Sequence, residues 1–436
     1  MTGREAALQV LTACRRLDAW SDGSLKAAVR GLDRREAAFA ARLTYGVLQN
    51  RALLDFYLGQ YCDQSFEKLE PFIRDVLRLG AYQILLMDRV PDSAAVSQAV
   101  EMVKHHRRQR AAGMVNAVLR RLSGEKDSLP AIPRGEEAEY LSLRYSHPKW
   151  LTERLLDLLG MEEAEEFLRL DNEPAPVVVQ RNPLRCGREE FVKYWEQAGA
   201  SLEAHPWMSD CWLLTGAGDL EEQAAFQEGW FLVQDAAAKA AVLAAGPEPG
   251  QRVLDVCAAP GGKTFSAAMA MEDRGEIISC DIHPHKLALI EKGAERLGLA
   301  CVRTELADGR ENRAAWNESF DLVLCDVPCS GLGIIRKKPD IRYKDSKKLA
   351  GLPRVQRAIL DNACRYVRPG GVLLYATCTI LPEENSRVTA AFLAAHPDFH
   401  QEPFRLPGGE ETDGSLTLWP QRHGTDGFYI CKMRRS

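Results

Sequence analysis

Apolar positions recur every three or four residues from the N-terminus to about residue 122. One such set includes Ala6, Val10 and Cys14, and another includes Val76 and Leu79. This spacing matches one face of an α-helix, and no alternating strand pattern interrupts it. The pattern predicts an all-α domain over residues 1–125. Glycine, proline and mixed charge then predict a linker over residues 126–139.

Apolar runs and helical patterns alternate from residue 140 onward. Short strands are expected at 177–182, 212–215 and 230–235, with helices at 151–159 and 189–199, which predicts a small α/β subdomain over residues 140–235. Beyond it, predicted strands lie at 252–256, 276–281, 301–304, 320–325 and 371–377. Helices are expected between and after them, at 264–271, 284–297, 346–366 and 382–396. Residues 236–436 are therefore predicted to form a Rossmann-like α/β domain, in which helices cover both faces of a parallel sheet.

Small residues fill the turn after the first of these strands, in the run Cys257-Ala-Ala-Pro-Gly-Gly-Lys-Thr264. Such a turn brings backbone atoms close to a flat or charged ligand, although alone it is weak support for a site. Asp281 ends the next strand, where related folds place the acid that binds ribose hydroxyls. The dinucleotide pattern G-x-G-x-x-G is absent. The two features together predict a nucleoside-containing cofactor.

Three aspartates follow strands of the predicted sheet: Asp281, Asp308 and Asp326. An aspartate after a strand is commonly a helix cap. Because parallel strands end at one edge of the sheet, three such residues together favour a ligand site. His283 and His285 flank Pro284, which is typical of a helix entry rather than a metal site.

The composition limits the class of protein. The chain has 436 residues, 46% of them hydrophobic and 27% charged, which indicates a soluble protein of two or three domains, expected in the cytoplasm. Twelve cysteines without C-x-x-C pairs argue against disulfides and against zinc, and no metal is expected. Since the net charge is −5, any nucleic acid would have to bind local basic runs. Two such runs are residues 104–110 and the group Arg336, Lys337, Lys338, Arg342, Lys344, Lys347 and Lys348, although a solvated face is the more common explanation of a run considered alone.

Several motifs resemble those of a known enzyme family. The loop 257–264 with Asp281, the run Asp-Val-Pro-Cys-Ser-Gly at 326–331 and Ala-Thr-Cys-Thr at 376–379 resemble the RNA cytosine-5 methyltransferases. Segments 43–50, 95–101 and 115–121 resemble the RNA-binding domain of the antitermination factor NusB. The likeness covers nearly the whole chain and is greatest to the branch that acts on small-subunit ribosomal RNA.

The resemblance implies S-adenosyl-L-methionine as cofactor and a role for each matching residue. Cys378 would be the nucleophile, Cys329 would help to release the product, and Asp326 would stabilise charge on the cytosine. The expected cofactor-binding residues are Cys257, Ala258, Ala259, Pro260, Gly261, Gly262, Lys263, Asp281 for the ribose, Asp308 for the adenine, and Asp326. The small subdomain would help to hold RNA through Arg181 and Asn182, although Arg181 could equally be a salt-bridge partner.

A thiol suits this chemistry because carbon 5 of cytosine is a poor nucleophile. Addition of a thiolate at carbon 6 makes carbon 5 reactive, which is covalent catalysis. Two cysteines rather than one distinguish the RNA enzymes from the DNA enzymes. The expected partner is 16S ribosomal RNA, free or in a partly assembled subunit, and the protein is expected to be a monomer without a membrane association. A tRNA methyltransferase and an RNA-binding factor with an inactive catalytic domain are the alternatives.

Overall fold

The computed structural model describes residues 1–17 and 21–436, with the side chains of Leu17 and Lys348 outside the description. The chain divides into two compact units. The helical unit comprises residues 1–173 and 335–344, and the α/β unit comprises residues 174–334 and 345–436. These units do not test the domain limits expected at residues 125, 139 and 235, which remain a prediction.

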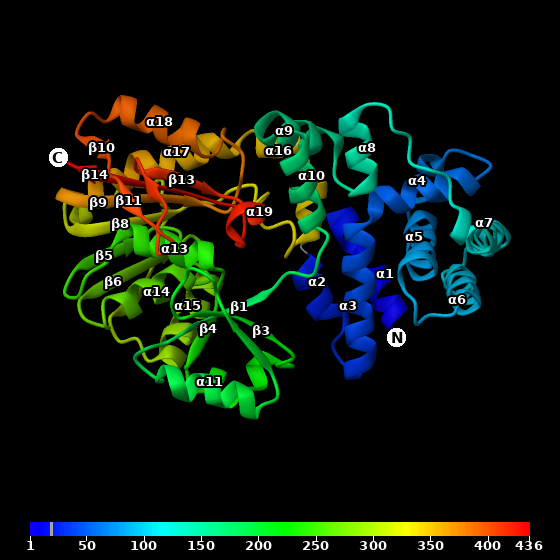
Figure 1. Ribbon diagram of the computed structural model, residues 1–436, viewed down its shortest axis with the longest axis horizontal. Helices are drawn as coiled ribbons and strands as arrows, with labels where there is room; N and C mark the ends of the chain where they lie inside the picture. Colours follow the sequence, from blue (N-terminus) through cyan, green and yellow to red (C-terminus); the bar gives the residue numbers. More distant parts are fainter. Residues whose placement is uncertain (18–20) are drawn as a thin grey trace. The chain divides into compact units, whose positions relative to one another are not determined.

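The helical unit is built from ten α-helices within the described residues (Figure 1). They are α1 (Gly3–Leu17), α2 (Ser21–Ala28), α3 (Arg34–Gln49), α4 (Arg51–Tyr61), α5 (Pro71–Leu86), α6 (Asp92–His105), α7 (Ala112–Gly124), α8 (Glu137–Arg144), α9 (Lys149–Leu159) and α10 (Met161–Leu170). Helix α5 is buried along most of its length, and α1, α3, α4, α6 and α7 pack around it. The prediction of an all-α N-terminal region is confirmed.

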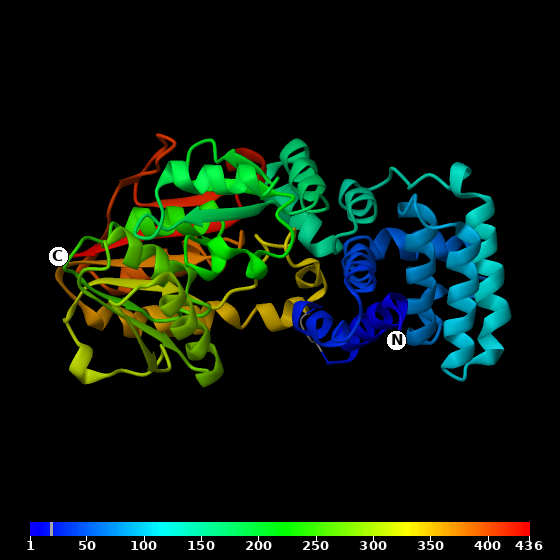
Figure 2. The same ribbon diagram turned by 90° about the horizontal axis from the view of Figure 1, so that it is seen from below.

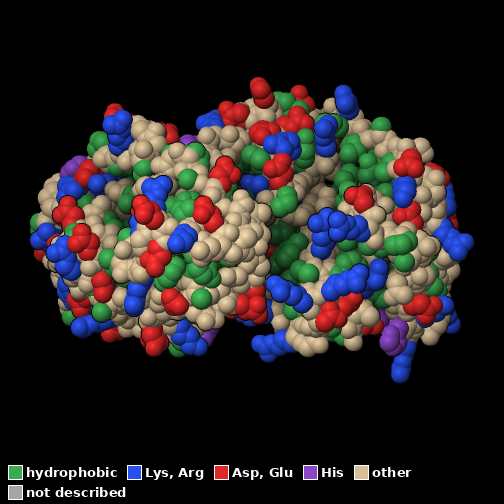
Figure 3. All heavy atoms as spheres, turned by 60° about the horizontal axis from the view of Figure 1, so that its bottom comes forward, with side chains coloured by type: hydrophobic (Ala, Val, Ile, Leu, Met, Phe, Trp, Pro, Cys, Tyr) green, Lys and Arg blue, Asp and Glu red, His purple; other side chains and the backbone are tan. Residues whose placement is uncertain are grey.

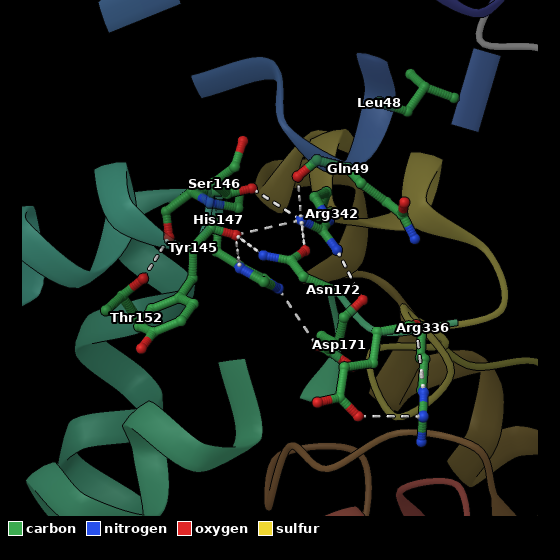
Figure 4. Close-up of polar contacts among 12 residues, drawn as sticks. Leu48, Gln49, Tyr145, Ser146, His147, Thr152, Asp171, Asn172, Arg336 and Arg342 are labelled. Atoms are coloured by element: carbon green, nitrogen blue, oxygen red, sulfur yellow. Dashed lines mark hydrogen bonds and ion pairs between the residues drawn. The ribbon is translucent and has the colours of Figure 1, made fainter. Parts of the chain in front are cut away.

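A remote segment completes the helical unit. Residues 335–344 include the 3₁₀ turn η6 (Pro339–Tyr343), which carries Arg342. The Arg342 side chain is fully buried, and it donates to the backbone oxygens of Gln49 at 2.9 Å and Ser146 at 3.0 Å and to the side-chain oxygen of Asn172 at 3.0 Å (Figure 4). The expectation that Arg342 contributes to a basic surface run is therefore wrong, because its guanidinium is buried and donates its hydrogen bonds to oxygens inside the unit.

The α/β unit begins with a small antiparallel sheet of order β2-β3-β1-β4. Its strands are β1 (Val177–Arg181), β2 (Ser201–Ala204), β3 (Cys211–Thr215) and β4 (Phe231–Val233), accompanied by α11 (Arg188–Gln197) and α12 (Ala224–Gln227). Phe191, Trp195, Trp212 and Phe231 form its core. Strand β2 was not predicted, because it is exposed and lacks an apolar alternation. The predicted α/β subdomain is confirmed.

The large sheet has the order β10-β14-β9-β8-β5-β6-β7, with β13 paired to β14. The parallel strands are β5 (Arg252–Asp255), β6 (Glu276–Asp281), β7 (Val302–Leu306), β8 (Phe320–Asp326) and β9 (Val367–Thr377). The antiparallel strands are β10 (Phe399–Gln401), β13 (Ser415–Leu418) and β14 (Phe428–Arg435). A separate pair, β11 (Phe404–Arg405) and β12 (Glu411–Thr412), lies off this sheet. The prediction of a Rossmann-like domain is confirmed, and the antiparallel strands extend the sheet sideways beyond β9.

Helices cover both faces of the large sheet (Figures 1 and 2). Helices α13 (Ala236–Ala245), α14 (Gly262–Ala270) and α15 (Pro284–Leu297) pack on one face, and α17 (Leu352–Ala363) and α18 (Ser386–Ala395) pack on the other. The single helix expected over residues 346–366 is wrong. It is interrupted between α16 (Ser346–Leu349) and α17, where Pro353 lies in the first turn of α17. A short helix, α19 (Pro420–His423), precedes β14.

None of the helices among the described residues is both long and apolar enough to cross a bilayer. The loops that follow β5, β6, β7, β8 and β9 all leave the same edge of the sheet, because these strands are parallel. This edge collects the motif residues of the candidate site.

Candidate active site

The loop between β5 and α14 is shaped by glycine. Gly261 has φ of +111°, and a β-carbon at this position would lie 2.4 Å from the ring of Phe265. Gly262 then begins α14, so the first amides of this helix point into the loop. Ala258 donates its amide to the oxygen of Cys280 at 2.8 Å, which fixes the loop against β6. The peptide between Ala259 and Pro260 is cis.

Asp281 and Asp308 lie after neighbouring strands. The Asp281 carboxylate is buried, and it accepts the amide of His283 at 2.9 Å and lies 3.5 Å from the ammonium group of Lys286. Asp308 forms an ion pair with Arg310 at 2.6 Å, and this contact lowers the pKa of Asp308. Both acids thus have local partners, but Asp281 accepts one backbone amide and has only a 3.5 Å contact with an ammonium group, whereas both carboxylate oxygens of Asp308 bind the Arg310 guanidinium.

Asp255 is a site residue that sequence reasoning missed. Its side chain is 1% exposed at the end of β5, and one carboxylate oxygen accepts the hydroxyl of Thr264 at 2.8 Å. The other oxygen has no hydrogen-bond partner among the residues that the structure describes. Burial raises the pKa of Asp255 to about 7. A charged residue inside the apolar run 253–256 was the signal that could have revealed it.

Lys263 and Asp326 form an ion pair at the same edge of the sheet. The Lys263 ammonium lies 2.7 Å from a carboxylate oxygen of Asp326 and 4.8 Å from the centre of the Phe428 ring. Sequence reasoning assigned only the backbone of Lys263 to the site. The pairing of its side chain depends on how β5 and β8 align, which no local pattern reveals.

Cys329 and Cys378 lie together after the adjacent parallel strands β8 and β9. Their sulfur atoms are 3.3 Å apart, and both side chains are partly exposed. The contact with Cys378, followed by burial, raises the pKa of Cys329 well above its usual range. Cys325 is fully buried in the core, as predicted.

Arg181 and Asn182 have structural partners. Arg181 pairs with Asp210 at 2.8 Å, which agrees with the salt-bridge interpretation. Asn182 is fully buried and donates to the oxygens of Gly229 at 3.1 Å and Leu297 at 3.0 Å. An RNA contact by either residue remains a prediction.

Comparison with known proteins agrees with this geometry. A family model described as 16S rRNA methyltransferase RsmB/F matches residues 241–434, a NusB family model matches residues 1–124, and a ferredoxin-like domain model, described as Methyltr_RsmF/B-like, matches residues 147–221. A Bacillus subtilis protein named "Probable ribosomal RNA small subunit methyltransferase B" is 34% identical over 99% of this chain and 98% of its own length. The chain belongs to the 16S rRNA methyltransferase RsmB/F family.

Other relatives of this RsmB/F-family protein are similar over most of their length. The "Ribosomal RNA small subunit methyltransferase B" of Erwinia tasmaniensis is 32% identical over 94% of this chain and 93% of its own. The crystal structure of PH0851 is similar with a TM-score of 0.82 and 26% identity, over 99% of this chain and 98% of that chain. The expected enzyme class, an S-adenosylmethionine-dependent rRNA methyltransferase with a NusB region, is thus confirmed.

Basic side chains of the RsmB/F-family protein gather on one face of the helical unit (Figure 3). Of the run at residues 104–110, Lys104 pairs with Glu101 at 2.8 Å and Arg108 with Glu70 at 2.6 Å. By contrast, four exposed residues on and between α2 and α3 form no ion pair with a carboxylate of the described residues: Lys26, Arg30, Arg34 and Arg35. We call these four residues the α2–α3 basic group. It has more uncompensated charge than the predicted run.

Proposed function

We propose that the protein transfers a methyl group from S-adenosyl-L-methionine to carbon 5 of a cytosine in 16S rRNA, with Cys378 as nucleophile. The observation that carries this proposal is the 3.3 Å contact between the sulfurs of Cys378 and Cys329. The reaction needs one thiol to attack and a second group beside it to help release the product. The Lys263–Asp326 ion pair at the same edge provides charged groups for the cytosine ring.

The loop and acids of the sheet edge suit the cofactor. Gly261 allows the loop to turn at φ of +111° directly before the N-terminal amides of α14, and Asp281 offers a buried carboxylate for a ribose diol. The backbone of residues 257–263 and the side chains of Asp281 and Asp308 would hold the group. When bound, S-adenosylmethionine supplies the methyl group that carbon 5 receives.

The two cysteines have different roles: Cys378 forms the covalent bond to the base, and Cys329 helps to break it. The Cys378 sulfur forms a bond to carbon 6, and the electron pair displaced from the ring makes carbon 5 nucleophilic. After carbon 5 is methylated, the Cys329 sulfur, as thiolate, takes the proton from carbon 5. The electron pair of that bond forms the double bond between carbons 5 and 6, the bond from carbon 6 to sulfur breaks, and Cys378 leaves as thiolate. Cys329, in contact with Cys378, assists this release. Asp326 stabilises charge at ring nitrogen 3 and the exocyclic amine.

The α2–α3 basic group supports an RNA substrate. Exposed arginines without carboxylate partners attract phosphate, and each phosphate contact adds about 0.7 to 0.9 to the slope of log affinity against log salt. Replacing Lys26, Arg30, Arg34 and Arg35 by glutamine should therefore reduce that slope by roughly three. The matched control replaces Lys104 and Arg108, whose charges are already paired. An unchanged slope in the fourfold variant would remove this face from the RNA interface.

The deciding experiment incubates Cys378→Ala and Cys329→Ala with S-adenosylmethionine and transcripts of 16S rRNA or tRNA. Cys378→Ala should form neither 5-methylcytosine nor a covalent adduct. Cys329→Ala should accumulate a protein–RNA adduct that resists a denaturing gel, with the 16S transcript only. An adduct from Cys378→Ala and none from Cys329→Ala would reverse the two roles, and an adduct with tRNA alone would contradict the 16S substrate.

A further inference from the structure

A buried carboxylate contacts the two loops that carry the cysteines. Glu384 is 1% exposed, and no Lys or Arg of the described residues pairs with it. One of its carboxylate oxygens accepts the amide of Ser330 at 2.9 Å and the side-chain amide of Gln356 at 2.8 Å. The other oxygen lies 3.5 Å from the hydroxyl of Thr379. Burying a carboxylate costs free energy unless its oxygens accept hydrogen bonds. These neutral donors therefore stabilise the Glu384 carboxylate inside the protein.

Its partners are the residues that follow the cysteines. Ser330 follows Cys329 and Thr379 follows Cys378, and the hydroxyls of Ser330 and Thr379 are themselves 2.7 Å apart. Glu384 therefore joins the loop after β8 to the loop after β9 at the positions next to both sulfurs. Glu384 can thus link the two loops without touching the substrate.

Two further bonds extend the bridge. Gln356, which is fully buried on α17, donates both to Glu384 and to the oxygen of Pro328 at 3.0 Å. The amide of Gly333 donates to the oxygen of Cys378 at 3.0 Å. The loop bearing Cys329 is thus held on both sides of its cysteine, and the anchor common to both loops is the Glu384 carboxylate.

We infer that Glu384 is a positioning residue that holds Cys329 against Cys378, so that product release follows methyl transfer promptly. This inference rests on the proposed function, because release matters only if Cys378 forms an adduct. The charge of Glu384 has a second effect, since it also contributes to the raised pKa of Cys329, after the contact with Cys378, burial and the charge of Cys378. A carboxylate near a thiol disfavours the thiolate, so it helps to keep the proton on Cys329.

Two substitutions separate geometry from charge. Glu384→Ala removes the bridge, whereas Glu384→Gln keeps an oxygen that can accept from Ser330 and Gln356 and removes only the charge. The matched control is Glu383→Gln, the adjacent residue, which pairs with Arg387 at 3.4 Å. Each full-length variant is given S-adenosylmethionine and the 16S transcript, and the lifetime of the adduct, the methylation rate and KM for the cofactor are measured.

We expect Glu384→Ala to lengthen the adduct lifetime by about tenfold or more while KM for the cofactor changes by less than about twofold. Glu384→Gln retains the bridge, so its adduct lifetime near pH 7 should be equal to or shorter than that of the wild type. The pH midpoint of release should move to lower pH, because loss of the negative charge favours the Cys329 thiolate. The control should match the wild type.

A normal adduct lifetime in folded Glu384→Ala, with Cys329→Ala trapping the adduct in parallel, would overturn the inference alone. If Glu384→Ala does not fold, Gln356→Ala decides, because it removes the bonds from Gln356 to Glu384 and to Pro328, and a wild-type adduct lifetime in folded Gln356→Ala also overturns the inference. Failure of Cys329→Ala to trap any adduct would overturn the proposed function and this inference with it.

Discussion

The Lys263 ammonium lies 2.7 Å from a carboxylate oxygen of Asp326, and this ion pair joins the start of α14 to the end of β8. An isolated carboxylate near Cys378 would oppose formation of the thiolate. Burial opposes the charge on Lys263, but the Asp326 carboxylate and its hydrogen bond outweigh burial and raise the pKa of Lys263. The Lys263 ammonium is therefore favoured, and its positive charge lies beside the carboxylate that neighbours the thiols.

Lys263→Met should slow alkylation of Cys378. The substitution leaves the Asp326 charge uncompensated, so the iodoacetamide reaction at pH 8 should fall by about tenfold. Peptide-resolved mass spectrometry separates Cys378 from the other cysteines, and Lys263→Arg is the charge-preserving control. An alkylation rate equal to that of the wild type would mean that Lys263 does not influence the nucleophile.

Asp281→Ala should weaken S-adenosylmethionine binding by more than about tenfold, because the ribose diol loses a charged acceptor. Asp308→Ala should have a smaller effect, since its carboxylate already pairs with Arg310. Titration calorimetry measures both, with Glu295→Ala on the exposed face of α15 as control. Equal affinities for wild type and Asp281→Ala would exclude Asp281 from the cofactor site.

Asp255 should make the α/β unit less stable as pH rises. Its folded pKa of about 7 exceeds the ordinary value of 3.8, so the folded state binds the extra proton between these values. The contribution of this proton to the free energy of unfolding is full below about pH 4. It is lost as pH rises through 7, and the free energy of unfolding falls by up to about 1.4 kcal/mol for each pH unit in between. Thermal melts from pH 5 to 8 should show a steeper loss for the wild type than for Asp255→Asn. If the melting temperatures of the two proteins fall in parallel with pH, the raised pKa of Asp255 is contradicted.

Arg342→Met should destabilise the helical unit by about 3 kcal/mol, because it leaves several buried oxygens without donors. The backbone oxygens of Gln49 and Ser146 and the amide oxygen of Asn172 would lose their partner. Circular dichroism melts of the full chain test this, with Arg30→Met as an exposed control. A variant that melts with the wild type would show that the buried guanidinium contributes no net stability.

Strong local signals allowed some elements to be predicted with their limits. The strand at 276–281 and the helix at 284–297 coincide with β6 and α15, since Gly275, Pro284 and Gly298 mark their ends. The exposed strand β2 and the antiparallel strands after α18 were not predicted, because they are short and their pairing partners lie far away in sequence.

For the candidate site, the sequence by itself determined the motif loops, both cysteines and the acids at the strand ends. These residues follow from the order of strands and turns, which local periodicity encodes. Only the tertiary structure decided that Lys263 pairs with Asp326, that Asp255 is buried, and that Glu384 bridges the cysteine loops. It likewise placed Arg342 inside the helical unit rather than on a basic surface. The reason is physical: burial and partner choice depend on which distant segments pack together, and a local pattern of side chains contains no record of that packing.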